Sequence, residues 1–279
     1  MNAEATLPPE CADFYRSAIE LLQANDIPFL LGGAYAICVY TGLARHTKDV
    51  DLFLRGADVN RTLELFRQHG FEAEKTFPHW LAKIHSGENF VDLIYAAGNG
   101  LCEVDDLWFS RAREEALLGR KVKVVAPEEI IWMKAFIQER ERFDGGDIVH
   151  LIQSCAEEIG WPYLRWRFGE DWRVLFAHLI LFGYIFPSER HRIPADLIRE
   201  LSERLATEHR TPNLEKICRG TLLSRAQYLP DVNERGYRDA RLEPRTAMDA
   251  RDVAQWTAAI DKKKVDVPAT CDKPPPPTL

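Results

Sequence analysis

The sequence lacks three features that would each point to a particular class of protein. Its six cysteines are scattered and form no Cys-x-x-Cys pair, which argues against a disulfide framework and against a zinc site. The longest apolar stretch, residues 174–186, contains His178 and is too short to span a bilayer. No basic segment followed by an apolar run stands near residue 1, so no secretory signal is evident. We therefore expect a cytoplasmic protein with free thiols and no membrane partner.

The composition is that of an ordinary globular protein. The chain has 279 residues, which can form one large domain or two modest ones, and 46% of them are hydrophobic. The net charge of −7 is uneven, because residues 1–160 are acidic and residues 161–240 are slightly basic. This pattern fits a metal site in the first half and an acceptor-binding lobe in the second, although chance variation in charge would also produce it.

The most informative stretch combines a glycine pair with two nearby aspartates. Residues 28–31 predict a short strand, Gly32 and Gly33 end it, and a helix is expected to begin at once. The free N–H groups at such a helix start can bind an anion such as phosphate. Asp49 and Asp51 lie on the next predicted strand, where a spacing of two places both carboxylates on one face. A divalent cation would relieve their mutual repulsion, so the stretch predicts a phosphate cradle beside half of a metal site.

A third carboxylate lies inside a predicted hairpin. Two strand-like runs flank the turn residues 86–89, and Asp92 stands in the middle of the second run. A carboxylate in an apolar strand is costly to bury unless something pairs with it, and the metal site is a natural partner. An exposed edge-strand aspartate is the alternative. His79 and Trp80 precede this hairpin, and we expect packing residues there rather than a stacking platform for a base.

These residues together resemble the nucleotidyltransferase superfamily typified by DNA polymerase beta. Its signature is an apolar residue, a Gly-Gly or Gly-Ser pair, a helix, and then Asp-x-Asp or Asp-x-Glu on the next strand. The long gap between Gly33 and Asp49, with Arg45 and Thr47 before the aspartates, is similar to the bacterial branch that contains toxin and abortive-infection enzymes. The resemblance covers about the first half of the chain, and it implies that Asp92 is the third catalytic carboxylate.

A lysine on a later predicted helix extends the candidate site. Pro127 and two following acids predict a helix start, and Lys134 lies on the apolar stripe of that helix. The ammonium group of such a lysine either reaches past the apolar surface into solvent or points into the site and contacts a triphosphate. The bacterial branch has such a lysine followed by an Asp-x-x-Asp element, which Asp144 and Asp147 match. We expect Asp144 to cap the next helix and Asp147 to position Lys134 or the acceptor.

The resemblance implies a metal-dependent transfer of a nucleoside monophosphate from an NTP to an acceptor, with release of pyrophosphate. Asp49, Asp51 and Asp92 would hold Mg²⁺ or Mn²⁺. Gly32, Gly33, Arg45, Thr47, Lys134 and Asp147 would form the nucleotide site. The acceptor is left open among RNA, protein and small molecule, as is an antitoxin partner. The alternatives are a metal-dependent glycosyltransferase and a nucleotide-binding regulatory module without turnover.

The expected architecture is a two-lobed α/β (α+β) protein. Residues 10–126 are predicted to form a nucleotidyltransferase domain with a small mixed β-sheet and flanking helices, whose topology the resemblance supplies. Residues 127–230 are predicted to form a helical lobe that contains Arg165 and Arg167, two candidate contacts for a polyanionic acceptor. Residues 231–279 are predicted to be a largely irregular or disordered tail.

Overall fold

A mixed β-sheet forms one end of the molecule. The computed structural model describes residues 9–43, 49–211 and 213–264. The sheet has seven strands in the order β3-β4-β5-β2-β1-β7-β6, with β2 parallel to β5, β1 parallel to β7 and the other neighbours antiparallel. Its strands are β1 (Leu30–Leu31), β2 (Asp49–Phe53), β3 (Glu72–Phe77), β4 (Leu81–Ser86), β5 (Asn89–Ile94), β6 (Arg113–Leu117) and β7 (Arg120–Val124). The predicted α/β class with a mixed sheet is confirmed, although β6 was not predicted.

Four helices belong to the sheet region, where α1 and α3 pack against β3, β4 and β5. Alternation along the strands explains this packing, since Val50 and Leu52 of β2 are buried while Asp49 and Asp51 remain partly exposed on the other face. The helices are α1 (Pro9–Ala24), α2 (Gly33–Thr41), α3 (Val59–Gln68) and α4 (Asp106–Arg111).

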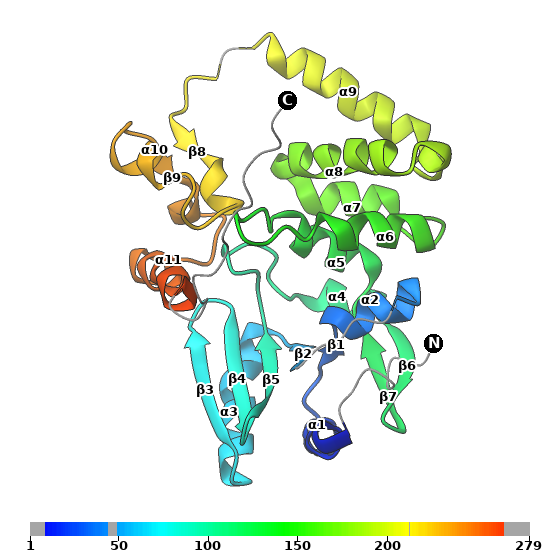
Figure 1. Cartoon of the computed structure of the whole chain (residues 1–279), viewed down its shortest axis with the longest axis vertical. Helices are drawn as coiled ribbons and strands as arrows, with labels where there is room; N and C mark the ends of the chain where they lie inside the picture. Colours follow the sequence, from blue (N-terminus) through cyan, green and yellow to red (C-terminus); the bar gives the residue numbers. More distant parts are fainter. Residues whose placement is uncertain (1–8, 44–48, 212, 265–279) are drawn as a thin grey trace, which may run out of the picture.

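A stack of helices forms the opposite end of the molecule (Figure 1). Pro127 begins the first of them, as the sequence predicts, because proline at a first helical turn loses no hydrogen bond. The helices are α5 (Pro127–Ala135), α6 (Gly145–Cys155), α7 (Trp161–Phe168), α8 (Trp172–Ile185) and α9 (Ala195–His209). Since α6 packs against both α2 and α5, the helix that follows the glycine pair lies beside the helical end.

The chain then returns from the helical end to the sheet. This return includes β8 (Ile217–Cys218), α10 (Leu229–Asn233), β9 (Arg238–Asp239) and α11 (Ala250–Lys264), and α11 packs against β3 (Figure 1). We predicted a largely irregular segment from residue 231, and α11 is a helix that this prediction did not include. Its described side chains are exposed or only partly buried, and it packs against β3, a strand distant in sequence. The predicted boundaries of the two lobes stay predictions.

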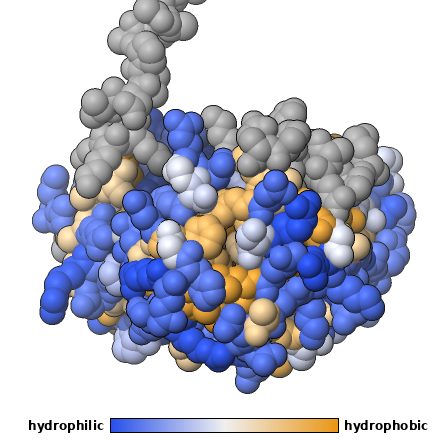
Figure 2. Space-filling model, turned by 90° about the horizontal axis from the view of Figure 1, so that it is seen from below, coloured by the Kyte–Doolittle hydropathy of each residue, from blue (hydrophilic) through white to orange (hydrophobic). Residues whose placement is uncertain are grey.

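The face at the sheet end of the molecule is mainly hydrophilic (Figure 2). Seen from the sheet end, hydrophilic residues surround a smaller hydrophobic area near the centre of that face (Figure 2). No helix within the described ranges is long and apolar enough to cross a membrane.

Candidate active site

The glycine pair places a helix start directly against a carboxylate. The Gly32 amide donates to the Asp51 carbonyl oxygen at 2.9 Å, which ties the turn to β2. Gly33, the first residue of α2, has φ +55, and a Cβ atom there would lie 1.6 Å from Oδ2 of Asp51. Only glycine permits both this backbone conformation and this approach. Among the residues that the structure describes, no side chain makes a capping hydrogen bond at the N-terminus of α2, so its first N–H groups remain suited to an anion.

Strand register brings the three predicted carboxylates together. Because β2 and β5 are parallel with Asp51 opposite Asp92, both side chains lie on the same face of the sheet. One carboxylate oxygen from each of Asp49, Asp51 and Asp92 lies within 4.8 Å of the other two. A set of closely spaced carboxylate oxygens is what a hard divalent cation such as Mg²⁺ prefers, so these residues fit a divalent metal site.

The electrostatics of the triad favour a cation. Burial, together with the charges of Asp49 and Asp92, raises the pKa of Asp51 to about 7, although Lys134 and Arg142 act in the opposite direction. Burial also raises the pKa of Asp92, against a hydrogen bond from Lys83. Burial and mutual repulsion thus disfavour the charged forms of these carboxylates. A bound divalent ion would stabilise those charged forms.

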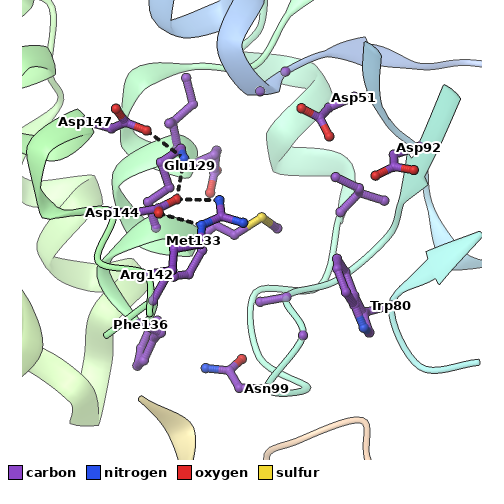
Figure 3. A pocket seen from close by; sticks show the side chains of 18 of the residues that line it. Asp51, Trp80, Asp92, Asn99, Glu129, Met133, Phe136, Arg142, Asp144 and Asp147 are labelled. Carbon is purple, nitrogen blue, oxygen red and sulfur yellow. Dashed lines mark hydrogen bonds and ion pairs between the residues drawn. The ribbon is translucent and has the colours of Figure 1, made fainter. Parts of the chain in front are cut away.

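A second charged group faces the triad across the cavity (Figure 3). Lys134 Nζ lies 2.6 Å from Oδ2 of Asp144 and 2.8 Å from Oδ2 of Asp147, and Arg142 holds Asp144 through two hydrogen bonds of 2.7 and 2.8 Å. Asp147 contacts Lys134, and its role in positioning that lysine stays a prediction. Asp144 occupies the N-cap position of α6, but its side chain makes no capping hydrogen bond and serves the two cations instead.

The triad and this charged group line one cavity of about 550 Å³. Trp80 stands on the same side as Asp92, and Met133 and Phe136 lie across from it (Figure 3). His79 is buried with Nε2 3.0 Å from the Gly98 carbonyl oxygen, so it is a packing residue as expected, whereas Trp80 lines the cavity. The cavity therefore combines a carboxylate cluster, a cationic group and an apolar wall, the components of a site for a charged ligand with a ring.

Comparison with known proteins identifies the family. Residues 12–208 match the family described as "Nucleotidyl transferase of unknown function (DUF2204)". The chain belongs to this family. No curated protein matches it.

Several solved structures are similar to this chain at low identity. The antibiotic-resistance factor ANT(2'')-Ia is 16% identical with a TM-score of 0.38, covering 73% of this chain and 97% of its own. The lincosamide antibiotic adenylyltransferase LnuA, with lincomycin bound, is 16% identical with a TM-score of 0.36, over 51% of this chain and 95% of its own. An antigenic nucleotidyltransferase-like protein from Paracoccidioides brasiliensis is 20% identical with a TM-score of 0.39, and the match covers 63% of this chain and 88% of that protein. Similarity at this level does not indicate which acceptor this chain would use.

The structure bears differently on the predicted phosphate contacts and on the predicted acceptor contacts of the helical lobe. Arg45 and Thr47 lie outside the described residues. Arg167 is not an acceptor contact, because its side chain is only 5% exposed and pairs with Asp105 and Glu129. Arg165 is paired with Glu200. Arg167 thus links α7 to Glu129 of α5 and to Asp105 at the start of α4, whereas the exposed Arg165–Glu200 pair should add little stability.

Several cavity residues were missed because their position depends on distant parts of the chain. Arg142 lies between α5 and α6, where it contacts Asp144 and lines the cavity, and no periodic pattern marks a residue in such a connection. Arg225 and Trp256 come from the segment beyond the family match, and Arg225 lies over the Trp256 ring with its Cζ atom 4.4 Å from the ring centroid. The sequence did offer a signal here, since Val253, Trp256 and Ile260 stand at helical spacing.

Proposed function

We propose that this chain transfers a nucleoside monophosphate from an NTP to an acceptor and releases pyrophosphate. The observation that carries the proposal is the placement of Asp49, Asp51 and Asp92 beside the uncapped start of α2 in one cavity. Membership of the nucleotidyltransferase family supports this reaction in general. It gives no support to the glycosyltransferase alternative, while a nucleotide-binding module without turnover stays the alternative to exclude.

The carboxylates divide into two roles by position. Asp49 and Asp51 follow the glycine turn on β2 and hold the cation that accompanies the triphosphate. Asp92 comes from the neighbouring hairpin. With the other two carboxylates it would hold a second ion beside the attacking group, and it accepts that group's proton. Bound Mg²⁺, or Mn²⁺ in its place, would polarise the transferred phosphoryl group and lower the pKa of the attacking hydroxyl.

The phosphates bind between the glycine turn and the cations of the opposite wall. The first N–H groups of α2 donate to phosphate oxygens. Lys134 and Arg142 neutralise further negative charge from across the cavity, with Asp144 and Asp147 fixing their positions. The roles predicted for Arg45 and Thr47 in phosphate binding remain predictions, as do the toxin branch, an antitoxin partner and a cytoplasmic location.

The proposal is tested by following labelled nucleotide. Each of the four NTPs, labelled at the α-phosphate, is incubated with the protein, Mg²⁺ and a cell extract. One fraction, RNA, protein or small molecule, should take up label with the parent protein, and Asp51→Asn should abolish the transfer. Binding of NTP without transfer of label to any fraction would favour the non-catalytic module.

Metal dependence has its own test. Calorimetry with ATP, CTP, GTP and UTP should show binding that depends on Mg²⁺, because triphosphate and carboxylates repel each other without a cation. Equal binding in EDTA would contradict the metal site.

A further inference from the structure

Asp92 has a neighbouring cation that the proposed reaction does not use. Lys83 on β4 lies directly opposite Asp92 in the β4–β5 register, and its Nζ atom is 2.5 Å from Oδ1 of Asp92. The two side chains are only 21% and 14% exposed, so solvent screens this ion pair weakly. The positive charge of Lys83 therefore lies next to the position that a divalent ion held by Asp92 would take.

The same face of the sheet offers Lys83 a second carboxylate. Glu74 on β3 is the register partner of Lys83 on its other side, so Asp92, Lys83 and Glu74 form a row across β5, β4 and β3, which lie side by side (Figure 1). The Glu74 carboxylate lies 3.9 Å from Nε2 of His85, so Lys83 would share it with that ring. Nζ of Lys83 lies 3.8 Å from the centroid of the Phe90 ring, a favourable seat for a cation. Lys83 can thus leave Asp92 without losing all of its favourable contacts.

We propose that Lys83 is an exchangeable counter-ion of Asp92 that competes with the divalent metal. The inference rests on the metal site of the proposed function. In the metal-free protein Lys83 neutralises the third carboxylate, and metal binding at Asp92 displaces its ammonium group toward Glu74 over the Phe90 ring. Lys83 is a positioning residue in this scheme, because it acts on the site through Asp92. It weakens metal binding by the nucleotide-free triad.

Two substitutions should change metal affinity in opposite directions. Lys83→Met keeps the stem and removes the competing charge, so Mn²⁺ should bind the nucleotide-free protein about tenfold more tightly. Coulomb's law gives about this effect for one charge removed from about 5 Å of a divalent ion in water, and more where the site is shielded from solvent, so about tenfold is the smallest change expected. Glu74→Gln removes the second partner, so Lys83 stays on Asp92 and Mn²⁺ should bind less tightly. Glu74 has a 62% exposed side chain, so this substitution is expected to fold.

The measurement is a Mn²⁺ titration followed by the electron paramagnetic resonance signal of the free ion, without nucleotide. Lys123→Met is the control, since Lys123 is an exposed lysine on β7, two strands from β2 on the opposite side to β4. Unchanged or weaker Mn²⁺ binding by Lys83→Met, with the control at the parental value, would overturn the inference. If the parent protein binds no Mn²⁺, the proposed metal site itself fails.

Discussion

At the scale of the residue, Lys134 shows how a cation can serve both fold and site. Sequence reasoning placed Lys134 on an apolar stripe, where its replacement by methionine would leave stability unchanged or raise it. The structure instead places its ammonium group between the carboxylates of Asp144 and Asp147, with the side chain 16% exposed. Removing a cation from a shielded pair leaves carboxylates without their partner, so the expected effect on stability changes sign.

Lys134→Met should therefore lower the free energy of unfolding by about 2 kcal/mol and also weaken NTP binding. Arg142 still holds Asp144 in the variant, which keeps the loss below that of a fully broken pair. Urea unfolding and calorimetry with Mg·NTP on the same preparation measure both effects. Lys121→Met, at an exposed lysine of β7, is the control and should change neither quantity. Parental stability of Lys134→Met would restore the original expectation.

Asp144 should make the protein sensitive to acid. Burial alone would raise its pKa, but hydrogen bonds from Arg142 and the charge of Lys134 bring the pKa below the usual 3.8. The folded state then binds a proton less readily than the unfolded state, so Asp144 contributes stability above pH 3.8 that is lost as the pH falls through the lower folded value. Unfolding free energies measured from pH 6 down to pH 3 should fall more steeply for the parent than for Asp144→Asn. Equal slopes would show that Asp144 has no such role.

At the scale of the element, the strand, turn and helix around Gly33 could be predicted because their signals are local. Two glycines end a short strand, and Asp49 and Asp51 share a face by simple alternation. The hairpin that carries Asp92 was also evident from its turn residues. The parallel pairing of β2 with β5 sets Asp92 opposite Asp51, and that pairing came from family resemblance, because periodicity does not reveal which strands are neighbours.

Gly33→Ala should displace the backbone turn that precedes α2 and thereby disrupt the site. The new Cβ atom would meet Oδ2 of Asp51 in a conformation with φ +55, so we expect a loss of about 3 kcal/mol in stability and weaker Mg·NTP binding. Gly87→Ala is a matched control, since Gly87 has φ +61 and open space around it. The control should lose about 1 kcal/mol and bind nucleotide normally. Thermal unfolding and calorimetry measure the difference, and equal effects of both changes would show that contact with Asp51 is unimportant.

At the scale of the whole molecule, the cavity is completed by a segment that follows the family match. Arg241 holds this segment together, since its side chain is fully buried and lies 2.6 Å from Oδ2 of Asp239 and 3.1 Å from Oγ1 of Thr257 on α11. Trp256 of α11 then packs against Phe77 and Trp80 with ring centroids 5.0 and 5.1 Å apart. These contacts join residues far apart in sequence, and composition alone suggested an irregular tail.

Arg241→Ala should loosen this segment, because it leaves Asp239 buried without its cation at a cost of about 3 kcal/mol. Hydrogen exchange should become faster at residues 217–264 and remain slow in β2 and β5. Arg238→Ala is the control, since Arg238 is 62% exposed and its partner Glu243 is 3.3 Å away. Slow exchange throughout the segment in Arg241→Ala would show that other contacts hold it.

The central claim is that the three carboxylates carry out nucleotidyl transfer, and Asp92→Asn tests it most directly. The change keeps the shape of the side chain and removes its charge, so β5 should survive. Asp49 and Asp51 remain to bind Mg·NTP, whereas the attacking group loses its base, which typically contributes about a hundredfold or more to a rate. NTP affinity and transfer of α-label are measured on one preparation. The account predicts near-parental affinity with transfer lowered at least about a hundredfold, and transfer at the parental rate would contradict it.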